Sequence, residues 1–360
     1  MPTASRKKVL IAPQHWGLGH VTRTIPVIRY FIRKGYELVL ASSGAGSNLL
    51  RKEFPELVVY DVPDYGITYP SRNMFWNMTF QIFKLHKAIL LEKIALGKIC
   101  KEHQIDLVVS DARLGAAQNG IASVIISHHL HIPLGSKLIE FISDTWMRFF
   151  YLQFNQIWVP DFGGDHNLSG DLAHRFKSSK HFFIGPLSRF RTMDLPQRFD
   201  ICFMLSGPEP QRRFFEEKIL SQINDLGPAK MILIRGTTTG AVLPKYVNLE
   251  VKDLVTSEEL NEIMCSSGLI VCRSGYSTLL DLSVIQKKAL LIPTPGQPEQ
   301  EYLGRGLMAK NLFLNVDQDD LNLKKHVKDA LAYPGYLEFQ PSSGLEYYLD
   351  PLIQKMLPEQ

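Results

Sequence analysis

The sequence predicts an α/β protein built from two tandem Rossmann-like domains, and three observations lead to this prediction. The chain has 360 residues, more than a single hydrophobic core usually spans. Short apolar runs typical of buried parallel strands alternate with longer helical patterns. This alternation begins again near residue 200. We therefore expect domains at residues 1–185 and 186–340, and a helix at 341–360 that packs back on the first domain.

The composition is that of an ordinary globular protein, with 45 % apolar and 21 % charged residues. No stretch approaches the roughly 20 apolar residues that span a bilayer. The apolar run after the basic amino terminus is too short for a signal peptide. We therefore expect a cytoplasmic protein. The four cysteines form no CxxC pair, which favours reduced, structural thiols.

Charge is unevenly distributed along the chain. Residues 1–185 contain 21 Lys and Arg against 14 Asp and Glu, whereas residues 186–360 contain 19 against 22. The basic first half would suit an anionic partner such as a lipid surface or a phosphorylated acceptor. A merely solvated surface is the more common origin of such a balance.

The first domain is predicted to open with a strand, a helix and a second strand. Lys8–Pro13 has the pattern of a buried parallel strand. Gly17, Gly19 and His20 come just before a helical pattern that Gly35 ends. The intervening loop follows the carboxyl end of the strand, where α/β sheets bind ligands. His20 is a candidate general base there, because its ordinary pKa of about 6.5 suits proton abstraction. A helix cap or surface residue is the alternative.

This opening is not a dinucleotide fingerprint. Thr22 stands where the third glycine of GxGxxG would be, and no acidic residue follows the second strand, which ends at Ser42. A nicotinamide cofactor is therefore disfavoured.

After a strand at 57–62, residues 75–103 have a strongly helical pattern. Most of its apolar stripe is expected in the core. Further large and basic residues fit a patch for a hydrophobic acceptor or a membrane surface: Trp76, Phe80, Phe83, Lys84 and Lys87.

Two further strand patterns end in polar side chains. Asp111 closes the strand at 105–111, and His128 closes the next one. Both are expected to face the same site as His20. The HHxH run at 128–131 does not suit a metal ion, because alternate strand residues point to opposite faces. A helix at 136–155 and strand patterns at 157–161 and 181–190 complete the domain.

The second domain repeats this arrangement. Strands are predicted at 200–206, 231–236, 269–272 and 289–292, and helices at 213–223, 258–264 and from Tyr276 onward. A helical pattern follows Gln300, and the DQDDL run at 317–321 resembles the capped entry to a further helix rather than a metal motif.

The central unit of the second domain is the turn between residues 269–272 and the helix at Tyr276. Gly275 lets the backbone approach a ligand, and the amino end of a helix attracts anions. A phosphate or diphosphate is the natural guest. Asp281 lies about two helical turns further on, where a carboxylate would accept hydrogen bonds from sugar hydroxyls. The alternative is that Ser274 and Ser277 only cap this helix.

Three motifs in order carry a family resemblance: GLGH at 17–20, CRSGYSTLLD at 272–281 and PTPGQPEQEY at 293–302. Together they resemble the GT-B fold glycosyltransferases, and among these the MurG-type (family 28) UDP-N-acetylglucosamine transferases. The resemblance covers both domains. It implies two Rossmann-like domains facing a cleft, with the acceptor on the first and the nucleotide sugar on the second. It also implies an inverting hexosyl transfer without a bound metal or cofactor.

The resemblance implies roles for particular residues. His20 matches the base or orienting group, with Gly17, Gly19, Asp111 and His128 on the acceptor side. The donor side would comprise the loop residues Ser206 and Gly207, Val255 at the base, the diphosphate turn Arg273, Ser274, Gly275, Tyr276 and Ser277, Asp281 at the ribose, Gln300 and Glu301 at the sugar, and Arg189.

Four departures from the family pattern affect these assignments. Asp281 replaces a longer Glu, and Glu301 replaces a Gln, which leaves the identity of the sugar open. The loop GPEPQR at 207–212 replaces a glycine-rich loop, and Arg189 is displaced by one residue from a phosphate-binding arginine.

The sequence thus predicts a UDP-sugar donor and an acceptor hydroxyl, with a lipid-linked or cell-envelope glycan as the suggested acceptor. It also suggests peripheral association with the inner face of a membrane, and no nucleic-acid partner. Two alternatives stay open: a UDP-sugar 2-epimerase, which needs several acid/base carboxylates, and a non-catalytic subunit that binds a nucleotide sugar.

Overall fold

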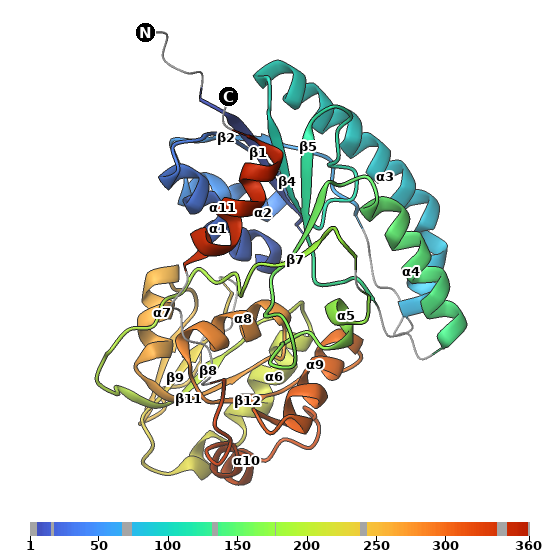
Figure 1. Cartoon of the computed structure of the whole chain (residues 1–360). Coiled ribbons are helices and arrows are strands. Elements are labelled where there is room, and N and C mark those ends of the chain that lie inside the picture. The colour runs from blue at the N-terminus through green and yellow to red at the C-terminus, as the bar shows by residue number, and fades with distance from the viewer. Residues whose placement is uncertain are drawn as a thin grey trace. The chain divides into compact units, whose positions relative to one another are not determined.

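The computed structural model describes residues 6–15, 18–66, 74–131, 136–176, 178–237, 243–336 and 344–358, with only the backbone of 74–82. The chain divides into two compact units (Figure 1). The first comprises Met1–Leu187 with Ser343–Gln360, and the second comprises Ser188–Ser342.

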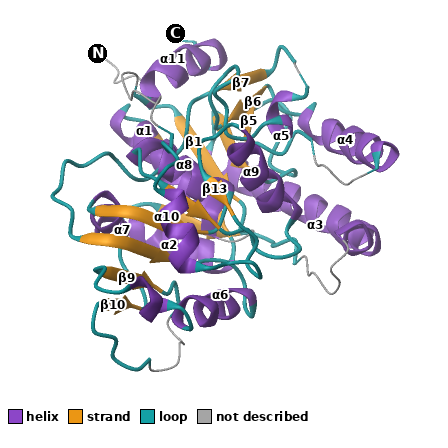
Figure 2. Ribbon diagram, turned by 90° about the horizontal axis from the view of Figure 1, so that it is seen from below, coloured by secondary structure: helices purple, strands orange, loops and turns teal. Residues whose placement is uncertain are grey.

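The first unit is built on a seven-stranded parallel sheet with the order β3-β2-β1-β4-β5-β6-β7. Its strands are β1 Lys8–Pro13, β2 Glu37–Ser42, β3 Val58–Asp61, β4 Leu107–Asp111, β5 Ala122–Ile126, β6 Gln156–Val159 and β7 His181–Phe183. In Figure 2 the neighbouring strands β5, β6 and β7 lie side by side with helices beside the sheet. The central strands are buried because helices cover both faces, which explains their continuous apolar runs.

The helices of the first unit are α1 Leu18–Arg33, α2 Gly44–Glu53, α3 Met74–His103, α4 Lys137–Tyr151, α5 Asp171–His174 and α11 Leu345–Met356. Helix α11, from the end of the chain, packs on α1. The Tyr30 hydroxyl donates a hydrogen bond to Asp350 at 2.7 Å. Leu349, Leu352 and Ile353 join the core cluster on this face of the sheet. The carboxyl terminus therefore completes the first unit.

The second unit holds a six-stranded parallel sheet with the order β10-β9-β8-β11-β12-β13. Its strands are β8 Phe199–Met204, β9 Met231–Ile234, β10 Leu249–Lys252, β11 Ser267–Cys272, β12 Ala289–Leu291 and β13 Leu314–Asn315. Its helices are α6 Gln211–Leu220, the 3-10 helix η1 Ile223–Leu226, α7 Ser257–Cys265, α8 Tyr276–Ile285, α9 Pro298–Ala309 and α10 Leu323–Ala330.

The predicted α/β class with two Rossmann-like sheets is confirmed. Some details differ. The sequence pattern did not predict α2 or β10. The helix after DQDDL starts at Leu323 and is capped by Asn322, whose side chain accepts a hydrogen bond from the Lys325 amide at 3.0 Å. The acidic run therefore ends before the cap instead of forming it.

Each sheet has one point at which the strand order reverses. It lies between β1 and β4 in the first unit and between β8 and β11 in the second. The loops that leave neighbouring strands at such a point run in opposite directions, which leaves a crevice at the carboxyl ends of the strands. Residues at these two edges are the candidates for function.

Candidate functional site

In the first unit, polar side chains meet at the carboxyl edge between β1 and β4. His20 and Arg23 belong to the first two turns of α1, Asp111 ends β4, and His128 follows β5. Asp111 is fully buried, and its carbonyl oxygen accepts a hydrogen bond from the Gln14 amide at 2.9 Å. The end of β4 is therefore tied to the end of β1. The structure brings together the three residues that the sequence placed here: His20, Asp111 and His128.

His20 and Asp111 form a hydrogen-bonded pair. The His20 Nδ1 atom lies 2.7 Å from Asp111 Oδ1, and the imidazole side chain is 12 % exposed. We assign the proton to Nδ1, which then donates to the ionised carboxylate, a group that only accepts hydrogen bonds. Arg23 Nη2 lies 2.9 Å from the same nitrogen, and with this tautomer it donates to Asp111 Oδ1 instead. The Nε2 atom then carries the lone pair, and it makes no hydrogen bond to any described residue. This arrangement is that of a general base with an orienting carboxylate.

The surroundings determine the charge of both groups. Burial lowers the pKa of His20, and the positive charge of Arg23 adds to this effect against the opposing influence of Asp111. Burial would raise the pKa of Asp111, but the charges and hydrogen bonds of Arg23 and His20 outweigh it and hold this pKa well below its usual range. Near neutral pH the pair therefore consists of a neutral imidazole and a carboxylate.

Arg23 is a central residue of this cluster that the sequence analysis missed. Its Nε donates to Asp111 Oδ2 at 2.6 Å, and its Nη2 donates to Oδ1. Its Nη1 donates to His128 Nδ1 at 3.0 Å, and the side chain is only 4 % exposed. The available signal was its spacing, because a residue three positions after His20 lies on the same helix face.

The carboxylate of Asp111 is fully engaged by protein groups. Besides Arg23 and His20, the Thr24 hydroxyl lies 3.2 Å from Oδ2. Asp111 is therefore not available as a metal ligand or as a mobile acid. Gly19 precedes His20 in the first turn of α1, and Gly17 lies outside the described residues.

In the second unit, the predicted diphosphate turn lies at the carboxyl edge of β11. Helix α8 begins at Tyr276, with Gly275 as its N-cap and no side-chain hydrogen bond at the cap. The Ser274 hydroxyl instead donates to the Gln300 carbonyl oxygen at 2.8 Å. Neither Ser274 nor Ser277 caps the helix, so the alternative of a purely structural serine cap is wrong. The amino end of α8 keeps its electropositive character.

Arg273 does not have the orientation that a diphosphate ligand requires. Its side chain is 1 % exposed and lies over the Phe215 ring, 4.3 Å from its centre. The guanidinium donates to four acceptors: the carbonyl oxygens of Ile292, Pro293 and Gln211, and Oε1 of Gln318. It joins the loops of this edge, and its assignment as a donor-binding side chain is corrected accordingly.

Asp281 lies on α8 and is half-buried. It accepts a hydrogen bond from the Ser188 hydroxyl at 2.5 Å. Burial raises its pKa to about 6, although the Ser188 hydrogen bond and the charge of Arg189 act in the opposite direction. Arg189 itself donates to the Ser257 hydroxyl at 2.9 Å, at the start of α7. Val255, in the connection from β10 to α7, is half-buried.

Gln300 and Glu301 belong to the first turn of α9 and hold the loop that precedes it. Gln300 Oε1 accepts from the Thr294 amide at 2.8 Å, and Glu301 Oε1 accepts from the Gly296 amide at 3.1 Å. Each side chain thus has a positioning role. Gln300 Nε2 makes no hydrogen bond to a described residue, so this amide group can donate to a ligand.

Ser206 and Gly207 follow β8, on the other side of the reversal point. Gly207 has φ of +100°, which favours glycine, and a Cβ atom there would lie 3.8 Å from the Thr294 hydroxyl. That hydroxyl is buried and has no hydrogen-bond partner among the described residues. A buried polar atom without a partner is uncommon, so it marks a place where a ligand would supply the missing hydrogen bond.

Comparison with known proteins finds similarity to glycosyltransferases. Residues 231–342 match the family model Glycosyltransferase family 28 C-terminal domain. The chain is 24 % identical over 320 residues to the uncharacterized glycosyltransferase MK0977 of Methanopyrus kandleri, which covers 81 % of this chain and 87 % of that protein. A second relative is the UDP-N-acetylglucosamine--N-acetylmuramyl-(pentapeptide) pyrophosphoryl-undecaprenol N-acetylglucosamine transferase of a Sulfurihydrogenibium species. The two sequences are 26 % identical over 140 residues, and the match covers 38 % of this chain and 39 % of that protein.

Solved structures show the same fold. The glycotransferase of kitacinnamycin superposes with a TM-score of 0.70 at 15 % identity, covering 98 % of this chain and 100 % of that chain. MurG of Acinetobacter baumannii superposes with a TM-score of 0.61 at 15 % identity, covering 97 % and 99 %.

Proposed function

We propose that this chain, which is a glycosyltransferase of the family 28 type with the GT-B fold, transfers a hexose from a UDP-sugar to an acceptor hydroxyl with inversion at the anomeric carbon. N-acetylglucosamine is the first candidate sugar, because a relative is named as an N-acetylglucosamine transferase. The observation that carries the proposal is the His20–Asp111 pair, which leaves Nε2 of a neutral imidazole without a hydrogen bond to described residues.

In the proposed step, His20 Nε2 takes the proton of the acceptor hydroxyl. The hydroxyl oxygen forms a bond to the anomeric carbon while the bond from that carbon to the diphosphate oxygen breaks. Asp111 stays ionised and stabilises the imidazolium that forms, because its pKa is held low by Arg23 and His20. Inversion follows from a single displacement at the anomeric carbon.

The donor side of the proposal rests on the edge of the second sheet. The electropositive start of α8, with the backbone of Gly275, Tyr276 and Ser277, would stabilise charge on the leaving diphosphate. Asp281 would accept hydrogen bonds from the ribose hydroxyls, and Gln300 Nε2 would donate to the sugar. Ser206, Gly207 and the backbone of Val255 would line the rest of the donor site.

A donor panel tests this proposal. The heat of binding and the slow hydrolysis of UDP-hexoses, with dTDP- and GDP-sugars for comparison, are measured for the wild type, His20→Ala and Asp281→Ala. We expect UDP-sugars to bind, His20→Ala to retain binding but lose hydrolysis, and Asp281→Ala to bind more weakly. Failure of every nucleotide sugar to bind would contradict the proposal.

The 2-epimerase alternative has less support, since Asp111 is engaged by Arg23 and cannot move protons freely. Epimerisation of a UDP-sugar without any acceptor would restore it. A non-catalytic binding subunit would bind donor without any turnover.

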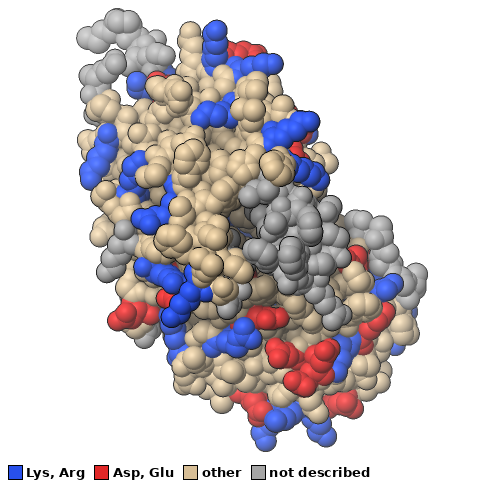
Figure 3. Space-filling model, turned by 90° about the vertical axis from the view of Figure 1, so that its right-hand side faces the viewer, with Lys and Arg blue, Asp and Glu red and all other residues tan. Residues whose placement is uncertain are grey.

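We also propose a lipid-linked acceptor and association with a membrane surface. Helix α4 and its C-cap residue Leu152 have an outward row of large apolar side chains that are 60–70 % exposed: Leu138, Phe141, Ile142, Phe149 and Leu152. On α3, Phe83 is 88 % exposed, while the side chains of Trp76 and Phe80 lie outside the described part of the chain. Figure 3 shows mainly uncharged surface with Lys and Arg side chains over this region. Such a face suits an anionic bilayer surface.

No helix in the described ranges has the length and apolar character needed to cross a membrane. The proposed association is therefore peripheral. Flotation with anionic liposomes should retain the wild type and the control Val247→Ser, which removes a fully exposed apolar residue of the second unit. The double variant Phe141→Ser, Phe149→Ser should be lost from the liposome fraction. Equal retention of all three would contradict the membrane proposal.

A further inference from the structure

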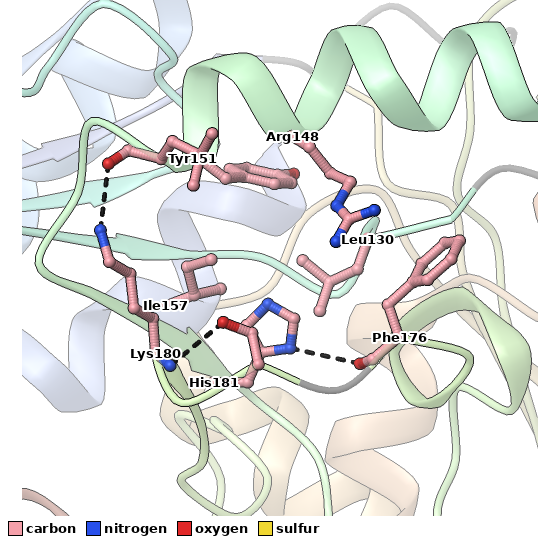
Figure 4. A pocket seen from close by; sticks show the side chains of 9 residues that line it. Leu130, Arg148, Tyr151, Ile157, Phe176, Lys180 and His181 are labelled. Atoms are coloured by element: carbon pink, nitrogen blue, oxygen red, sulfur yellow. Dashed lines mark hydrogen bonds between the residues drawn. The ribbon is translucent and has the colours of Figure 1, made fainter.

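A second polar site in the first unit lies apart from His20 and Asp111. It is a pocket between the carboxyl end of α4, the loop after β5 and the segment that leads into β7 (Figure 4). The pocket contains about 490 Å³ of empty space, counting its solvent-open mouth. The pocket is thus open to solvent on one side.

The polar side chains that line the pocket are basic or neutral. They are Arg148, Lys180, His181, Ser178 and Tyr151, and the described lining residues include no Asp or Glu. Arg148 forms no ion pair or hydrogen bond through its side chain with the described residues. Its guanidinium lies 5.5 Å from the centre of the Phe176 ring. This charge is available to an anion, and a hydrogen bond to a charged group is stronger than one between neutral groups.

His181 faces the same space. Its Nδ1 lies 3.3 Å from the Phe176 carbonyl oxygen, to which it donates a hydrogen bond. Figure 4 shows its ring directed into the pocket from the side opposite Arg148. Burial, with a smaller contribution from Arg148, lowers the pKa of His181. The neutral ring presents a lone pair on Nε2, so it can accept a hydrogen bond from a protonated phosphate oxygen or take up a proton beside a phosphate dianion.

Lys180 fixes one wall of the pocket. Its Nζ donates to the carbonyl oxygens of Leu152 at 3.0 Å and Phe154 at 2.8 Å, just beyond the end of α4. Its charge therefore stays near the pocket while its ammonium group satisfies backbone acceptors. The Arg148 guanidinium makes no hydrogen bond to a described residue, so it is the positive group that can turn toward a bound anion.

The other lining residues are apolar, and they extend from the protein interior to the surface. Leu130 and Ile157 are buried, whereas Leu152 is 69 % exposed. Leu152, directly after α4, is also the last member of the outward apolar row that includes Phe149. The pocket thus joins a cationic interior to an apolar surface, which is the pattern that matches an amphiphile with an anionic headgroup.

Tyr151 connects this pocket to the catalytic edge. Its ring lines the pocket, and its hydroxyl lies 2.9 Å from the Ser127 hydroxyl and 2.9 Å from the His129 carbonyl oxygen. These two residues flank His128, which accepts a hydrogen bond from Arg23. Tyr151 therefore links the wall of the pocket to the segment that holds His128.

We propose that this pocket binds the phosphate group of an amphiphile whose apolar chain lies along the outward face of α4. The inference rests on the proposed function, because it assigns this phosphate to the acceptor or to a lipid of the surface that carries it. The shared chemistry is a phosphate ester next to an apolar chain.

The test uses the full-length protein and three probes: decyl phosphate below its micelle concentration, inorganic phosphate, and decyl maltoside. Binding is followed by calorimetry and by NMR of the histidine rings. We expect decyl phosphate to bind, to shift the His181 ring signals and to raise the pKa of His181. Inorganic phosphate should bind at least 10-fold more weakly, because it lacks the apolar chain. Decyl maltoside should leave the His181 signals unchanged.

Arg148→Gln should weaken decyl phosphate binding about 10-fold, whereas Leu152→Ser should weaken it without affecting inorganic phosphate. Arg29→Gln is the matched control, because Arg29 is an exposed arginine of the same unit that does not line the pocket. Unchanged affinity in Arg148→Gln would overturn the phosphate assignment. Equal affinity for inorganic and decyl phosphate would overturn the amphiphile assignment.

UDP-sugar binding, measured in the same samples, separates this inference from the proposed function. Arg148→Gln should bind UDP-sugar as the wild type does. If the wild type binds decyl phosphate at His181 but binds no UDP-sugar, the proposed function fails and the pocket stands. If it binds UDP-sugar but decyl phosphate leaves His181 unchanged, the pocket inference fails alone.

Discussion

At the residue scale, the geometry of the His20–Asp111 pair depends on the buried side chain of Arg23. Arg23 holds both oxygens of Asp111 and contacts His128, so it positions the carboxylate that orients His20. These contacts are all with protein groups, so Arg23 acts as a positioning residue. Its charge also lowers the pKa of His20, which keeps the imidazole neutral and able to accept a proton.

Replacing Arg23 should therefore change both rate and pH dependence. Arg23→Gln removes the positive charge, so the pKa of His20 should rise and the acidic limb of the pH–rate profile for donor hydrolysis should move to higher pH. We expect a loss of about 10- to 100-fold in kcat/KM. Arg29→Gln, on the exposed face of the same helix, should behave as the wild type. A lower rate with an unmoved acidic limb would mean that Arg23 is only structural.

Asp281 gives donor binding a pH dependence. Its pKa is raised to about 6, so the carboxylate is ionised above this pH and protonated below it. The ionised form accepts two hydroxyl hydrogen bonds, whereas the protonated form loses part of this capacity. The affinity for a UDP-sugar, whose diphosphate does not titrate in this range, should therefore fall as the pH drops from 7.5 to 5. Calorimetry at several pH values measures this, and Asp281→Asn should bind the UDP-sugar more weakly and nearly independently of pH. An equally steep pH dependence in Asp281→Asn would assign it to another group.

The sequence predicted part of this site. His20, Asp111 and His128 were found because strand ends in a parallel sheet meet at one edge. Arg23 was missed because a helix pattern does not reveal which basic residue turns inward. Arg273 was assigned to the ligand because it precedes the turn, but its side chain is buried in the protein and donates hydrogen bonds to loop carbonyl oxygens. Periodicity alone did not show whether an arginine side chain is buried among protein acceptors or faces a ligand.

At the scale of elements, the start of α8 is the proposed diphosphate site. Gly275 has φ of −70°, so its backbone does not require glycine, and a Cβ atom would meet only the Thr278 hydroxyl at 3.9 Å. An alanine would therefore fit the folded protein. It would also place a methyl group where the diphosphate is proposed to approach the backbone.

Gly275→Ala should thus lower UDP affinity about 10-fold while changing the free energy of unfolding by no more than about 1 kcal/mol. Gly306→Ala, in α9, is the control, because a Cβ atom there meets nothing within 4 Å. It should keep the donor affinity of the wild type. Calorimetry and thermal unfolding measure the two quantities. Wild-type affinity in Gly275→Ala would exclude close backbone contact at this turn.

Most elements were predictable because buried strands and amphipathic helices have clear patterns. The start of α8 was predicted at Tyr276, where the structure has it. Helix α2 was missed because its sequence, GAGSNLLRKE, contains two glycines and a polar half, and glycine has low helix propensity. Strand β10 was missed because it lies at the sheet edge, is only four residues long and is mostly half-exposed. Both elements are held by tertiary packing.

At the scale of the whole molecule, the chain terminus completes the unit in which the chain begins. Leu349 of α11 is fully buried in the core cluster that it shares with α1, whereas Tyr347 on the same helix is 70 % exposed. Leu349→Ala should lower the free energy of unfolding of the first unit by about 2–5 kcal/mol, because it removes buried methyl groups and leaves a cavity.

Unfolding followed by the histidine ring signals of the first unit measures this effect, and UDP binding reports on the second unit. Leu349→Ala should retain UDP binding at temperatures where it is still folded. Tyr347→Ala should be close to the wild type in both measurements. Equal stability of Leu349→Ala and Tyr347→Ala would mean that α11 does not support the first unit.

The most direct test of the proposed reaction is the configuration of the sugar released from the donor. NMR of the early products of UDP-N-acetylglucosamine hydrolysis identifies the anomer before it equilibrates. A single inverting displacement aided by His20 predicts that the β-anomer appears first in the wild type and that its formation is lost in His20→Ala. Initial release of the α-anomer, or the same rate in His20→Ala, would contradict the account.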